Sequence, residues 1–459
     1  MVSALMISAT HSGAGKTTVT AAVLRALVRR GLDVRSFKVG PDFIDPMYHS
    51  EITGRPSVNL DVWMMGEDGV RRTFEAWSAG ADIVVIEAMG ALFDGADCTD
   101  EGSAAHVARL LGVPVLVVMD VWGMTRTASA LMAGMSAFDP RVAPAGFVLN
   151  RVGGDTHTDL ILRSLTGPQR EAVVGALPAD PLLEVGERHL GLVTTHENPD
   201  DPERRSRALD RAADRLDVDR LLALAARSRT PEPPAPVADS HDTDRTSTPP
   251  GPRLAIARDA AFCFYYEDNL RLLTRAGFTL IPFSPLNGEP PPEAEAVYLG
   301  GGYPESFAAE LAAAVESAAG LRAAAERGVP VYAECGGLLY LGRSLTGFDG
   351  SVHTMAGVLP LDCAMDPDHL AIRYVEARTR HASPLGPAGT VLRGQEFHRS
   401  RVVAADLEPD LYDVVSSAGE RFVHGYRLGS VMGSYVHAHF AADPAPLEHL
   451  VAAARARIV

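Results

Sequence analysis

A phosphate-loop pattern near the start of the chain constrains its fold more than any other feature. Residues 10–18 read THSGAGKTT, which fits GxxxxGK[ST] except that Thr10 stands in place of the first glycine. The apolar run ALMISAT precedes the loop, and apolar residues at helical spacing follow it from Val19 to Leu27. Between a strand and a helix, backbone N–H groups, Lys16 and the helix dipole can hold phosphate oxygens. The alternative is a plain glycine-rich turn, but the pattern favours a nucleotide-binding α/β sheet.

Further apolar runs extend this pattern along the chain. VRSFKVG, DIVVIEA, VPVLVVMD and PAGFVLNRV alternate with expected helices, and RLAIARD, FTLIPFSP, AEAVYLGGG and VPVYAEC do the same later. Continuous apolar strands that alternate with helices indicate parallel sheets covered on both faces. The predicted fold class is therefore α/β, with two doubly wound domains.

A segment rich in Pro, Ser, Thr and Asp, residues 226–252, separates the two sets of strands. Because such a segment has few apolar side chains to bury, we expect an extended linker. A length of 459 residues also exceeds what one ordinary core holds. The sequence predicts domains of residues 1–225 and 253–459, joined by this linker.

The composition argues against several kinds of partner. A formal net charge of −16 is unlike that of nucleic-acid-binding surfaces, which concentrate Lys and Arg. The longest apolar runs fall short of the ~20 residues that span a bilayer, and the first residues show no basic, cleavable leader. The four cysteines form no CxxC pair, which favours reduced thiols. We expect a cytoplasmic protein that binds neither nucleic acid nor membrane.

Acidic residues follow two of the predicted strands. KVGPDFIDP contains Asp42 and Asp45, and VVIEAMGALFDG contains Glu87 and Asp94. Ligands of open α/β sheets bind at the carboxyl ends of the strands, so these carboxylates are candidates for Mg²⁺ or phosphoryl chemistry. Each alone is equally explained as a helix cap or a loop acid, but four at one predicted crevice favour a site.

The stretch VYAECGGLLYLG, residues 331–342, predicts a second kind of chemistry. Cys335 ends an apolar run, and two glycines follow it directly. A nucleophile on a sharp strand-to-helix turn needs small neighbours, because Cβ atoms would crowd the turn and the substrate. The helix N-terminus there favours the thiolate. Cys335 is thus a candidate nucleophile, with a buried structural cysteine as the alternative.

Several longer stretches resemble the cobyrinic acid a,c-diamide synthase family. They are the segment from Ser12 to Met65, ERHLGL at 187–192, ARDAAFCFYYEDNLRLL from Ala257, LGGGYPE from Leu299, YAECGGLLYL and GSYVHAHF from Gly433. These stretches occur in the family's order and cover both predicted domains. The resemblance implies a P-loop NTPase-like domain similar to dethiobiotin synthetase, followed by a flavodoxin-like, class I-type glutamine amidotransferase domain.

The resemblance implies ATP-driven amidation of the a- and c-acetates of cobyrinic or hydrogenobyrinic acid, with glutamine as nitrogen donor. ATP phosphates would bind the loop, and Asn150, at the end of AGFVLN, would contact the adenine, although an Asn there is also a common turn residue. Mg²⁺ would bind Thr17, Asp45 and Glu87, with Asp42 and Asp94 near the γ-phosphate or the substrate carboxylate. The loop residues concerned are Gly13, Ala14, Gly15, Lys16, Thr17 and Thr18.

For the second domain the resemblance implies a glutaminase. Cys335 would attack the glutamine side-chain amide, and His437 in GSYVHAHF would act as base and then acid. The backbone N–H groups of Gly301 and Gly302 would hold the oxyanion. Ordinary members of this class end their triad in His-x-Glu, whereas here His439 stands in the Glu position. We therefore expect a dyad, and the sequence leaves open what orients His437.

Two alternatives stay open. Within the same class of enzyme, relatives amidate other tetrapyrroles such as nickel sirohydrochlorin, although the segment GPDFIDPMYHSEITGRPSVNLDVWMM favours a corrin. From a different class, a Min- or partition-like regulatory ATPase also has a phosphate loop. Such ATPases carry an extra Lys about where His11 stands here, and they lack an amidotransferase domain. The sequence does not select between a cobalt-bearing and a metal-free corrin, nor between a monomer and a homodimer.

Overall fold

The structure is a computed structural model that describes residues 2–95, 99–183, 202–229 and 251–457. Cys98, the ERHLGL stretch and most of the expected linker lie outside these residues. The chain divides into two compact units: unit 1 is Met1–Val62 with Gly66–Val237, and unit 2 is Ala238–Val459 with Trp63–Met65. Helix α9 ends at Ala225 and strand β8 begins at Arg253. The domain limits 1–225 and 253–459 stay a prediction, because most of the residues between them are not described.

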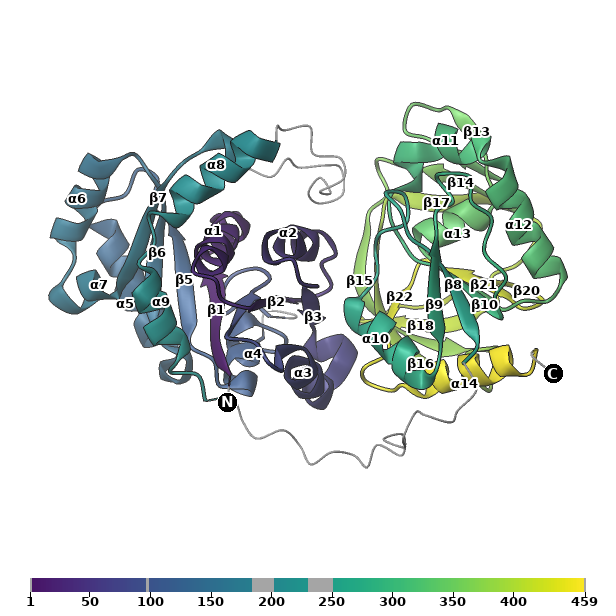
Figure 1. Ribbon diagram of the computed structural model, residues 1–459, viewed down its shortest axis with the longest axis horizontal. Helices are drawn as coiled ribbons and strands as arrows, with labels where there is room; N and C mark the ends of the chain where they lie inside the picture. Colours follow the sequence, from purple (N-terminus) through teal and green to yellow (C-terminus); the bar gives the residue numbers. More distant parts are fainter. Residues whose placement is uncertain (1, 96–98, 184–201, 230–250, 458–459) are drawn as a thin grey trace. The chain divides into compact units, whose positions relative to one another are not determined.

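The described part of unit 1 is built on one seven-stranded parallel sheet, in the order β3-β2-β4-β1-β5-β6-β7 (Figure 1). The strands are β1 (Ser3–Ala9), β2 (Val34–Val39), β3 (Val58–Leu60), β4 (Ile83–Glu87), β5 (Val115–Asp120), β6 (Gly146–Val152) and β7 (Val173–Pro178). The helices are α1 (Lys16–Arg29), α2 (Ile44–Thr53), α3 (Val62–Ser78), α4 (Ala104–Leu111), α5 (Thr127–Phe138), α6 (Asp155–Ser164), α7 (Gly167–Ala172), α8 (Pro202–Ala213) and α9 (Val218–Ala225). The predicted parallel α/β sheet is confirmed.

A buried core holds α1 against this sheet. Val19, Val23 and Leu27 lie on one face of α1, as their helical spacing predicts, and pack with Leu5 and Ile7 of β1. Helices α8 and α9 join the same core. Because α1 begins directly after β1 and its loop, this packing fixes the loop at the carboxyl edge of the sheet, where β2 and β4 also end.

The described part of unit 2 contains a central six-stranded sheet in the order β20-β21-β11-β10-β8-β9. Its strands are β8 (Arg253–Ala257), β9 (Thr279–Phe283), β10 (Ala296–Leu299), β11 (Val331–Glu334) and β21 (Val431–Ser434), all parallel, with β20 (Tyr426–Leu428) antiparallel at one edge. Read along the chain, the parallel strands follow the 2-1-3-4-5 order of flavodoxin-like sheets, which confirms the predicted fold. The helices are α10 (Glu267–Ala276), α11 (Ala308–Ala313), α12 (Val315–Glu326), α13 (Gly336–Leu341) and α14 (Ala445–Arg455).

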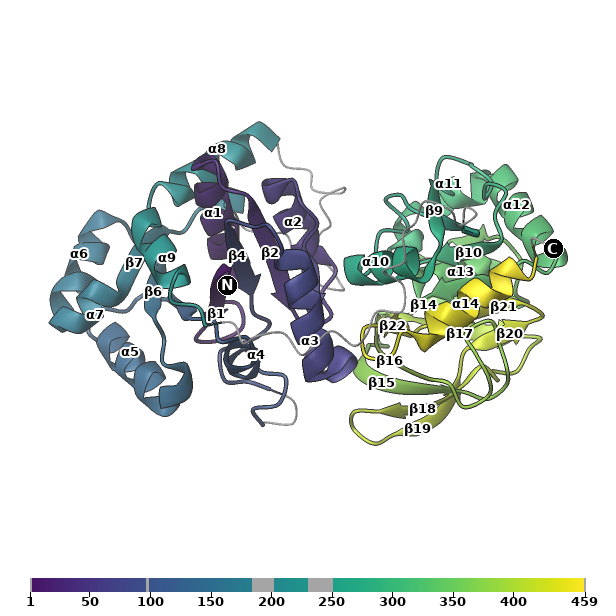
Figure 2. The same cartoon turned by 60° about the horizontal axis from the view of Figure 1, so that its bottom comes forward.

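Two smaller sheets of unit 2 were not predicted from the sequence. Within the described residues, one contains β12 (Ser344–Thr346), β13 (Val352–Thr354), β14 (Leu361–Met365) and β17 (Ser400–Ala405). The other contains β15 (Ala371–Thr379), β16 (Val391–His398), β18 (Tyr412–Ser416), β19 (Arg421–His424) and β22 (His437–His439), with β19 at its outer edge (Figure 2). This second sheet carries His437.

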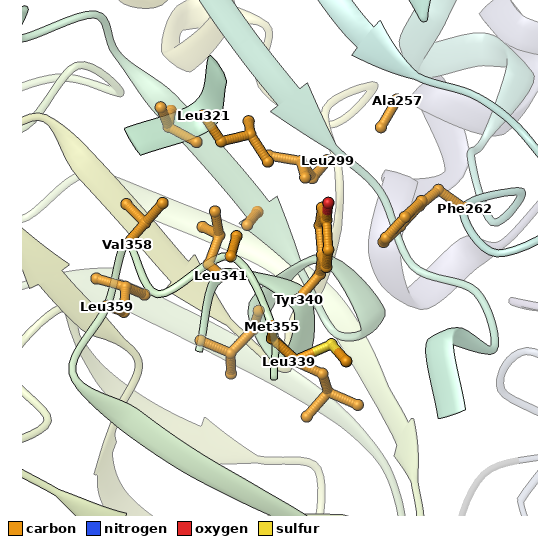
Figure 3. Close-up of a cluster of buried hydrophobic side chains, with 14 of the residues drawn as sticks. Ala257, Phe262, Leu299, Leu321, Leu339, Tyr340, Leu341, Met355, Val358 and Leu359 are labelled. Carbon is orange, nitrogen blue, oxygen red and sulfur yellow. The ribbon is translucent and has the colours of Figure 1, made fainter. Parts of the chain in front are cut away.

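The two faces of the central sheet in unit 2 pack against separate cores. Alternate residues such as Val331 and Ala333 face a core that includes α11, α12 and α13, whereas Tyr332 faces a core that includes α10, α14 and β15. Figure 3 shows the first core around Leu339, Tyr340 and Leu341 of α13. A six-residue helix is too short to be stable alone, so this burial stabilises α13 and fixes the turn before it.

Candidate active sites

The phosphate loop of unit 1 has the backbone that its glycines predict. Gly13 has φ 81° and Gly15 has φ 88°, both in the left-handed region that glycine adopts without strain. Gly15 forms the N-cap of α1, so Lys16 and Thr17 open the helix. The Lys16 side chain is buried. Burial and the charge of Lys38 lower the pKa of Lys16, so this ammonium is suited to an anionic partner.

Asn150 of β6 reaches the same loop. Its Nδ2 donates a hydrogen bond to the carbonyl of Ala14 at 2.9 Å, and a Cβ on Gly15 would overlap Nδ2. The side chain therefore supports the loop backbone at the place where Gly15 has to stay small. The adenine contact expected of Asn150 remains a prediction.

A buried cluster of charges lies next to the loop, with Lys38 at its centre. Lys38 Nζ lies 3.0 Å from Glu87 Oε1, forms an ion pair with Asp45 and lies 3.5 Å from Asp42 Oδ2. Residues 38 and 87 are neighbours in the register of β2 and β4. Burial opposes the Lys38 charge, but Asp45 and Glu87 outweigh it and hold the Lys38 pKa well above its ordinary value. Despite its own burial, Glu87 has a lowered pKa because Lys38 and His49 stabilise its carboxylate.

Thr17 connects this cluster to the loop. Its hydroxyl donates to Glu87 Oε1 at 3.0 Å and lies 3.4 Å from both carboxylate oxygens of Asp45. In the described ranges, no group of three or more His, Cys, Asp or Glu side chains is arranged for a metal ion. Mg²⁺ on a nucleotide needs only one or two carboxylates, because phosphate and water oxygens complete its shell. The oxygens of Thr17, Asp45 and Glu87 therefore fit Mg²⁺.

The other two predicted acids differ in position. Asp42 Oδ1 accepts the backbone N–H of Ile44 at 2.8 Å and that of Asp45 at 3.3 Å, so it stabilises the start of α2 as well as facing Lys38. Asp94 is exposed on the loop after β4, and no hydrogen bond or ion pair among the described residues joins it to the cluster. The structure thus brings three of the four acids together around Lys38.

Lys38 and His49 belong to this site although sequence reasoning did not select them. His49 lies one turn after Asp45 on α2, is fully buried, and its Nε2 lies 2.8 Å from Glu87 Oε2. The spacing from Asp45 to His49 places both on one face of a helix, which was a usable signal. For Lys38 the signal is composition: Lys16 and Lys38 are the only lysines in the chain.

In unit 2, Cys335 lies at the turn between β11 and α13. It is the N-cap of α13 with φ 46° and ψ −103°, a strained conformation for a residue with a side chain. A Cβ on Gly336 would lie 3.0 Å from the backbone nitrogen of Gly302, and one on Gly337 would overlap the carbonyl of Leu299. Both glycines are therefore required by space, and Cys335 occupies the predicted sharp turn.

Gly301 and Gly302 lie between this turn and His437. A Cβ on Gly301 would overlap Cε1 of His437 and lie 3.2 Å from both ring nitrogens. The N–H of the preceding Gly300 donates to the Tyr265 hydroxyl at 2.8 Å, which fixes the loop. The structure thus brings the predicted nucleophile, base and oxyanion glycines into one place.

The protonation states of Cys335 and His437 follow from burial. Burial raises the Cys335 pKa far above its ordinary value, whereas the backbone N–H of Gly336 at the helix N-terminus lowers it. Burial lowers the His437 pKa to about 3, which leaves the imidazole neutral. A neutral imidazole beside a thiol can serve as a base.

We expect Gly301→Ala to reduce glutamine-dependent activity by about 100-fold, because the new Cβ displaces the imidazole of the base. Activity with added ammonium salt should stay within about twofold of the wild type, since it does not need this site. Both rates are measured on the same preparation, with thermal unfolding as the control for folding. Unchanged use of glutamine would show that His437 does not need its present position.

Two family models match the chain, one over each unit. Residues 5–193 match a CobQ/CobB/MinD/ParA nucleotide binding domain, and residues 253–445 match a CobB/CobQ-like glutamine amidotransferase domain. The first description also covers Min- and partition-type ATPases. The second match is what separates this chain from those proteins.

Curated relatives align over nearly the whole chain. The cobyrinate a,c-diamide synthase of Syntrophotalea carbinolica is 41% identical over 448 residues, covering 96% of each chain. That of Synechocystis sp. is 40% identical, covering 98% of this chain and 93% of the relative. The hydrogenobyrinate a,c-diamide synthase of Mesorhizobium japonicum is 41% identical, covering 95% of this chain and 98% of the relative. Both domains of these relatives are therefore present here in the same order.

Proposed function

The chain belongs to the family of cobyrinate and hydrogenobyrinate a,c-diamide synthases, and we propose that it uses ATP and glutamine to amidate the a- and c-acetates of a corrin in cobalamin biosynthesis. The observation that carries this proposal is the strained turn at Cys335, whose following glycine packs against the glycine loop that meets His437, in a chain that also has a phosphate loop. A switch ATPase has no use for such a cysteine. An amidoligase needs both sites, one to activate the carboxylate and one to release ammonia.

In unit 1, the backbone from Gly13 to Thr18 and the Lys16 ammonium bind the ATP phosphates. Thr17, Asp45 and Glu87 would hold Mg²⁺, which would supply positive charge to offset that of the ATP phosphates. The corrin carboxylate attacks the γ-phosphorus, the bond to the β-phosphate oxygen breaks, and an acyl phosphate and ADP form. Lys38 and Asp42, which face each other beside the loop, would act near the transferred group, and the same role for Asp94 stays a prediction. Ammonia then attacks the acyl carbon, phosphate leaves, and the amide remains.

In unit 2, Cys335 Sγ attacks the glutamine side-chain carbon while its proton passes to His437. The amides of Gly301 and Gly302 stabilise the oxyanion. His437 returns the proton to the leaving nitrogen, which departs as ammonia. Water then hydrolyses the thioester to glutamate, and His437 acts as base a second time.

We expect Glu87→Gln and Asp45→Asn each to lower corrin amidation by about 100-fold, because each removes one charge from the phosphate-binding cluster. The release of glutamate from glutamine should persist, since unit 2 is unchanged. Rates are measured across a Mg²⁺ titration, and thermal unfolding checks for damage caused by the lost partner of Lys38. An unaltered rate and Mg²⁺ dependence in both variants would rule out the metal site.

A parallel substrate assay tests the function. Purified protein with ATP, Mg²⁺ and glutamine receives cobyrinic acid, hydrogenobyrinic acid or nickel sirohydrochlorin, and mass spectrometry counts the amides formed. We expect two amides on a corrin and none on nickel sirohydrochlorin. Relatives of both corrin types are 41% identical to this chain, so the assay also decides whether cobalt is required. Two amides on nickel sirohydrochlorin alone would replace the corrin as substrate.

The partners of this reaction are a corrinoid, glutamine and ATP. We further propose that the protein is cytoplasmic and that it binds no nucleic acid; the reduced-thiol pattern and the net charge of −16 support these two statements. Over the described residues, no helix is both long and apolar enough to cross a membrane.

A further inference from the structure

A buried acid, Glu334, directly precedes Cys335 in the chain. It is the last residue of β11, and its side chain is 2% exposed. A carboxyl group seldom lies so deep unless its oxygens are bonded or it faces a charge. The steps of glutamine hydrolysis described above give this group no task.

Three hydrogen bonds hold the Glu334 carboxylate in one orientation. Tyr298 donates its hydroxyl to Oε2 at 2.8 Å, Tyr332 donates to Oε1 at 2.8 Å, and the backbone N–H of Ala438 donates to Oε1 at 3.1 Å. Residues 298 and 332 are partners in the register of β10 and β11, and Tyr332 and Glu334 share a face because side chains alternate along a strand. The sheet itself therefore builds this binding place for a carboxylate.

The same carboxylate faces the imidazole of His437. Glu334 Oε2 lies 4.0 Å from His437 Nδ1, and both side chains are 2% exposed. The bond from Ala438 ties Oε1 to the residue that follows His437 on β22. One carboxylate oxygen thus anchors the strand of the base, and the other faces its ring. Since Nδ1 faces Glu334, the opposite nitrogen, Nε2, is left to exchange the proton with Cys335.

The chemistry of the base creates a need for such a group. When His437 accepts the thiol proton, an imidazolium forms in surroundings whose burial lowers the imidazole pKa to about 3. A buried cation is costly unless an opposite charge lies close by. At 4.0 Å in a low-dielectric interior, a carboxylate supplies that charge. In Ser-His-Asp sites the third residue hydrogen-bonds to Nδ1 and stabilises the imidazolium. At 4.0 Å, Glu334 faces the same nitrogen of His437 and can stabilise its charge.

We propose that Glu334 is the positioning residue of the glutaminase: it orients His437 through Nδ1 and balances the imidazolium, in place of the Glu that His439 replaces. The proton moves from Cys335 Sγ to His437 Nε2 and later to the leaving ammonia, and Glu334 keeps its own protonation state throughout. This inference rests on the proposed function, since it assumes that Cys335 and His437 hydrolyse glutamine.

Other ionisable groups lie near the site, and a test has to distinguish their effects from that of Glu334. Glu305, Glu334 and Glu396 all raise the Cys335 pKa through their charges, and Arg373 pairs with Glu396 at 2.7 Å. Burial raises the Glu334 pKa to about 7, against the hydrogen bonds of Tyr332, Tyr298 and Ala438. The groups that couple to Glu334 by charge are Tyr265, Tyr298, Tyr332 and Tyr412. A comparison at a pH well above 7 therefore has the Glu334 carboxylate ionised.

Glu334→Gln removes the charge and keeps the shape. We expect kcat with glutamine to fall by about 100-fold while KM for glutamine stays within about threefold, because Glu334 does not touch the substrate. Synthesis from ammonium chloride should be unchanged. Tyr332→Phe is the matched control, because it removes a hydrogen bond to Oε1, the carboxylate oxygen that does not face His437. We expect this variant to lower kcat with glutamine by less than about fivefold. Equal losses in both variants would indicate a structural role and overturn the proposal.

The pH dependence of Cys335 alkylation by iodoacetamide should shift in opposite directions for the two electrostatic roles that Glu334 can have. If Glu334 stabilises the imidazolium, Glu334→Gln should move the rise of the alkylation rate to higher pH. If Glu334 acts on Cys335 only by repulsion, its removal should move the rise to lower pH; with a purely structural role the profile should not move. Either of the last two results would overturn the proposal. Peptide mass spectrometry assigns the label to Cys335 rather than to the other three cysteines.

Should Glu334→Gln fail to fold, as judged by thermal unfolding, Tyr298→Phe decides. It keeps the charge but removes the donor that holds Oε2 toward His437, so we expect a five- to tenfold loss of kcat with glutamine; no loss would overturn the proposal. Cys335→Ala distinguishes a failure of the proposed glutaminase function from a failure of the role proposed for Glu334. If that variant still uses glutamine, the proposed function fails; if it does not, while Glu334→Gln is fully active, only the role of Glu334 fails.

Discussion

Cys335→Ala should lose glutamine-dependent amidation by at least about 1,000-fold and keep ammonium-dependent amidation within about twofold of the wild type. Without the thiol no thioester forms, so no ammonia is released from glutamine. The acyl phosphate is still made in unit 1, because that step uses only the phosphate loop and its carboxylates. Replacing a thiol by a methyl group changes little volume, so the fold should persist. Amidated corrin is measured with glutamine and with ammonium chloride side by side, at mildly alkaline pH where free ammonia is present.

Three further variants make this result specific. His437→Ala should behave like Cys335→Ala with some residual glutaminase activity, whereas His439→Ala should be milder. Cys363→Ala is a matched control, because Cys363 is a fully buried thiol of the same unit. Its amidation rates with glutamine and with ammonium should change to the same extent, if at all. If Cys335→Ala instead fails with both donors or with neither, Cys335 is structural.

Lys16→Ala should abolish amidation with either nitrogen donor, by at least about 1,000-fold. Phosphorylation of the carboxylate precedes any use of ammonia, so added ammonium cannot rescue this variant. The Lys16 side chain is buried at the start of α1, directly after the glycines of the loop. ADP formation and amidated corrin are both measured. Arg30→Ala, at the far end of the same helix, removes a charge outside the site and should leave both rates unchanged; normal turnover by Lys16→Ala would remove the ATP site from the mechanism.

Much of the architecture could be predicted from the sequence because its strands are continuous apolar runs. VPVLVVMD can only be buried on both faces, and β5 is. Gly13 and Gly15 predicted a phosphate loop, in which both have left-handed backbone, and Gly336 and Gly337 predicted a turn with no room for a Cβ. In each case a local physical requirement restricts the residue type, so the local pattern reports the structure.

The two smaller sheets of unit 2 escaped prediction for a related reason. In β15, AIRYVEART, buried residues are interspersed with partly or fully exposed ones, so the strand has no continuous apolar run. Its partners β16 and β18 are antiparallel to it and come from later in the chain. Pairing over such separations is decided by tertiary packing, which a local pattern does not record.

The residues missed in the two sites share one property: each is a charged or ionisable group buried by partners far away in sequence. Lys38 is stabilised by Glu87, and Glu334 by Tyr298 and Ala438. Their signal in the sequence is a charged residue inside or at the end of an apolar strand, as in VRSFKVG and VYAEC. The role of such a residue can be assigned only when the structure shows which side chain on a neighbouring strand it contacts.

In the proposed reaction, ATP activates a corrin carboxylate as an acyl phosphate before ammonia arrives. The most direct test uses the accepted corrin with ¹⁸O in its carboxyl groups, together with ATP, Mg²⁺ and glutamine, and measures the isotope in the inorganic phosphate released. Attack of the carboxylate on the γ-phosphorus and displacement by ammonia should leave one ¹⁸O atom in phosphate for each amide formed. Amide formation with phosphate that carries no ¹⁸O would contradict the account.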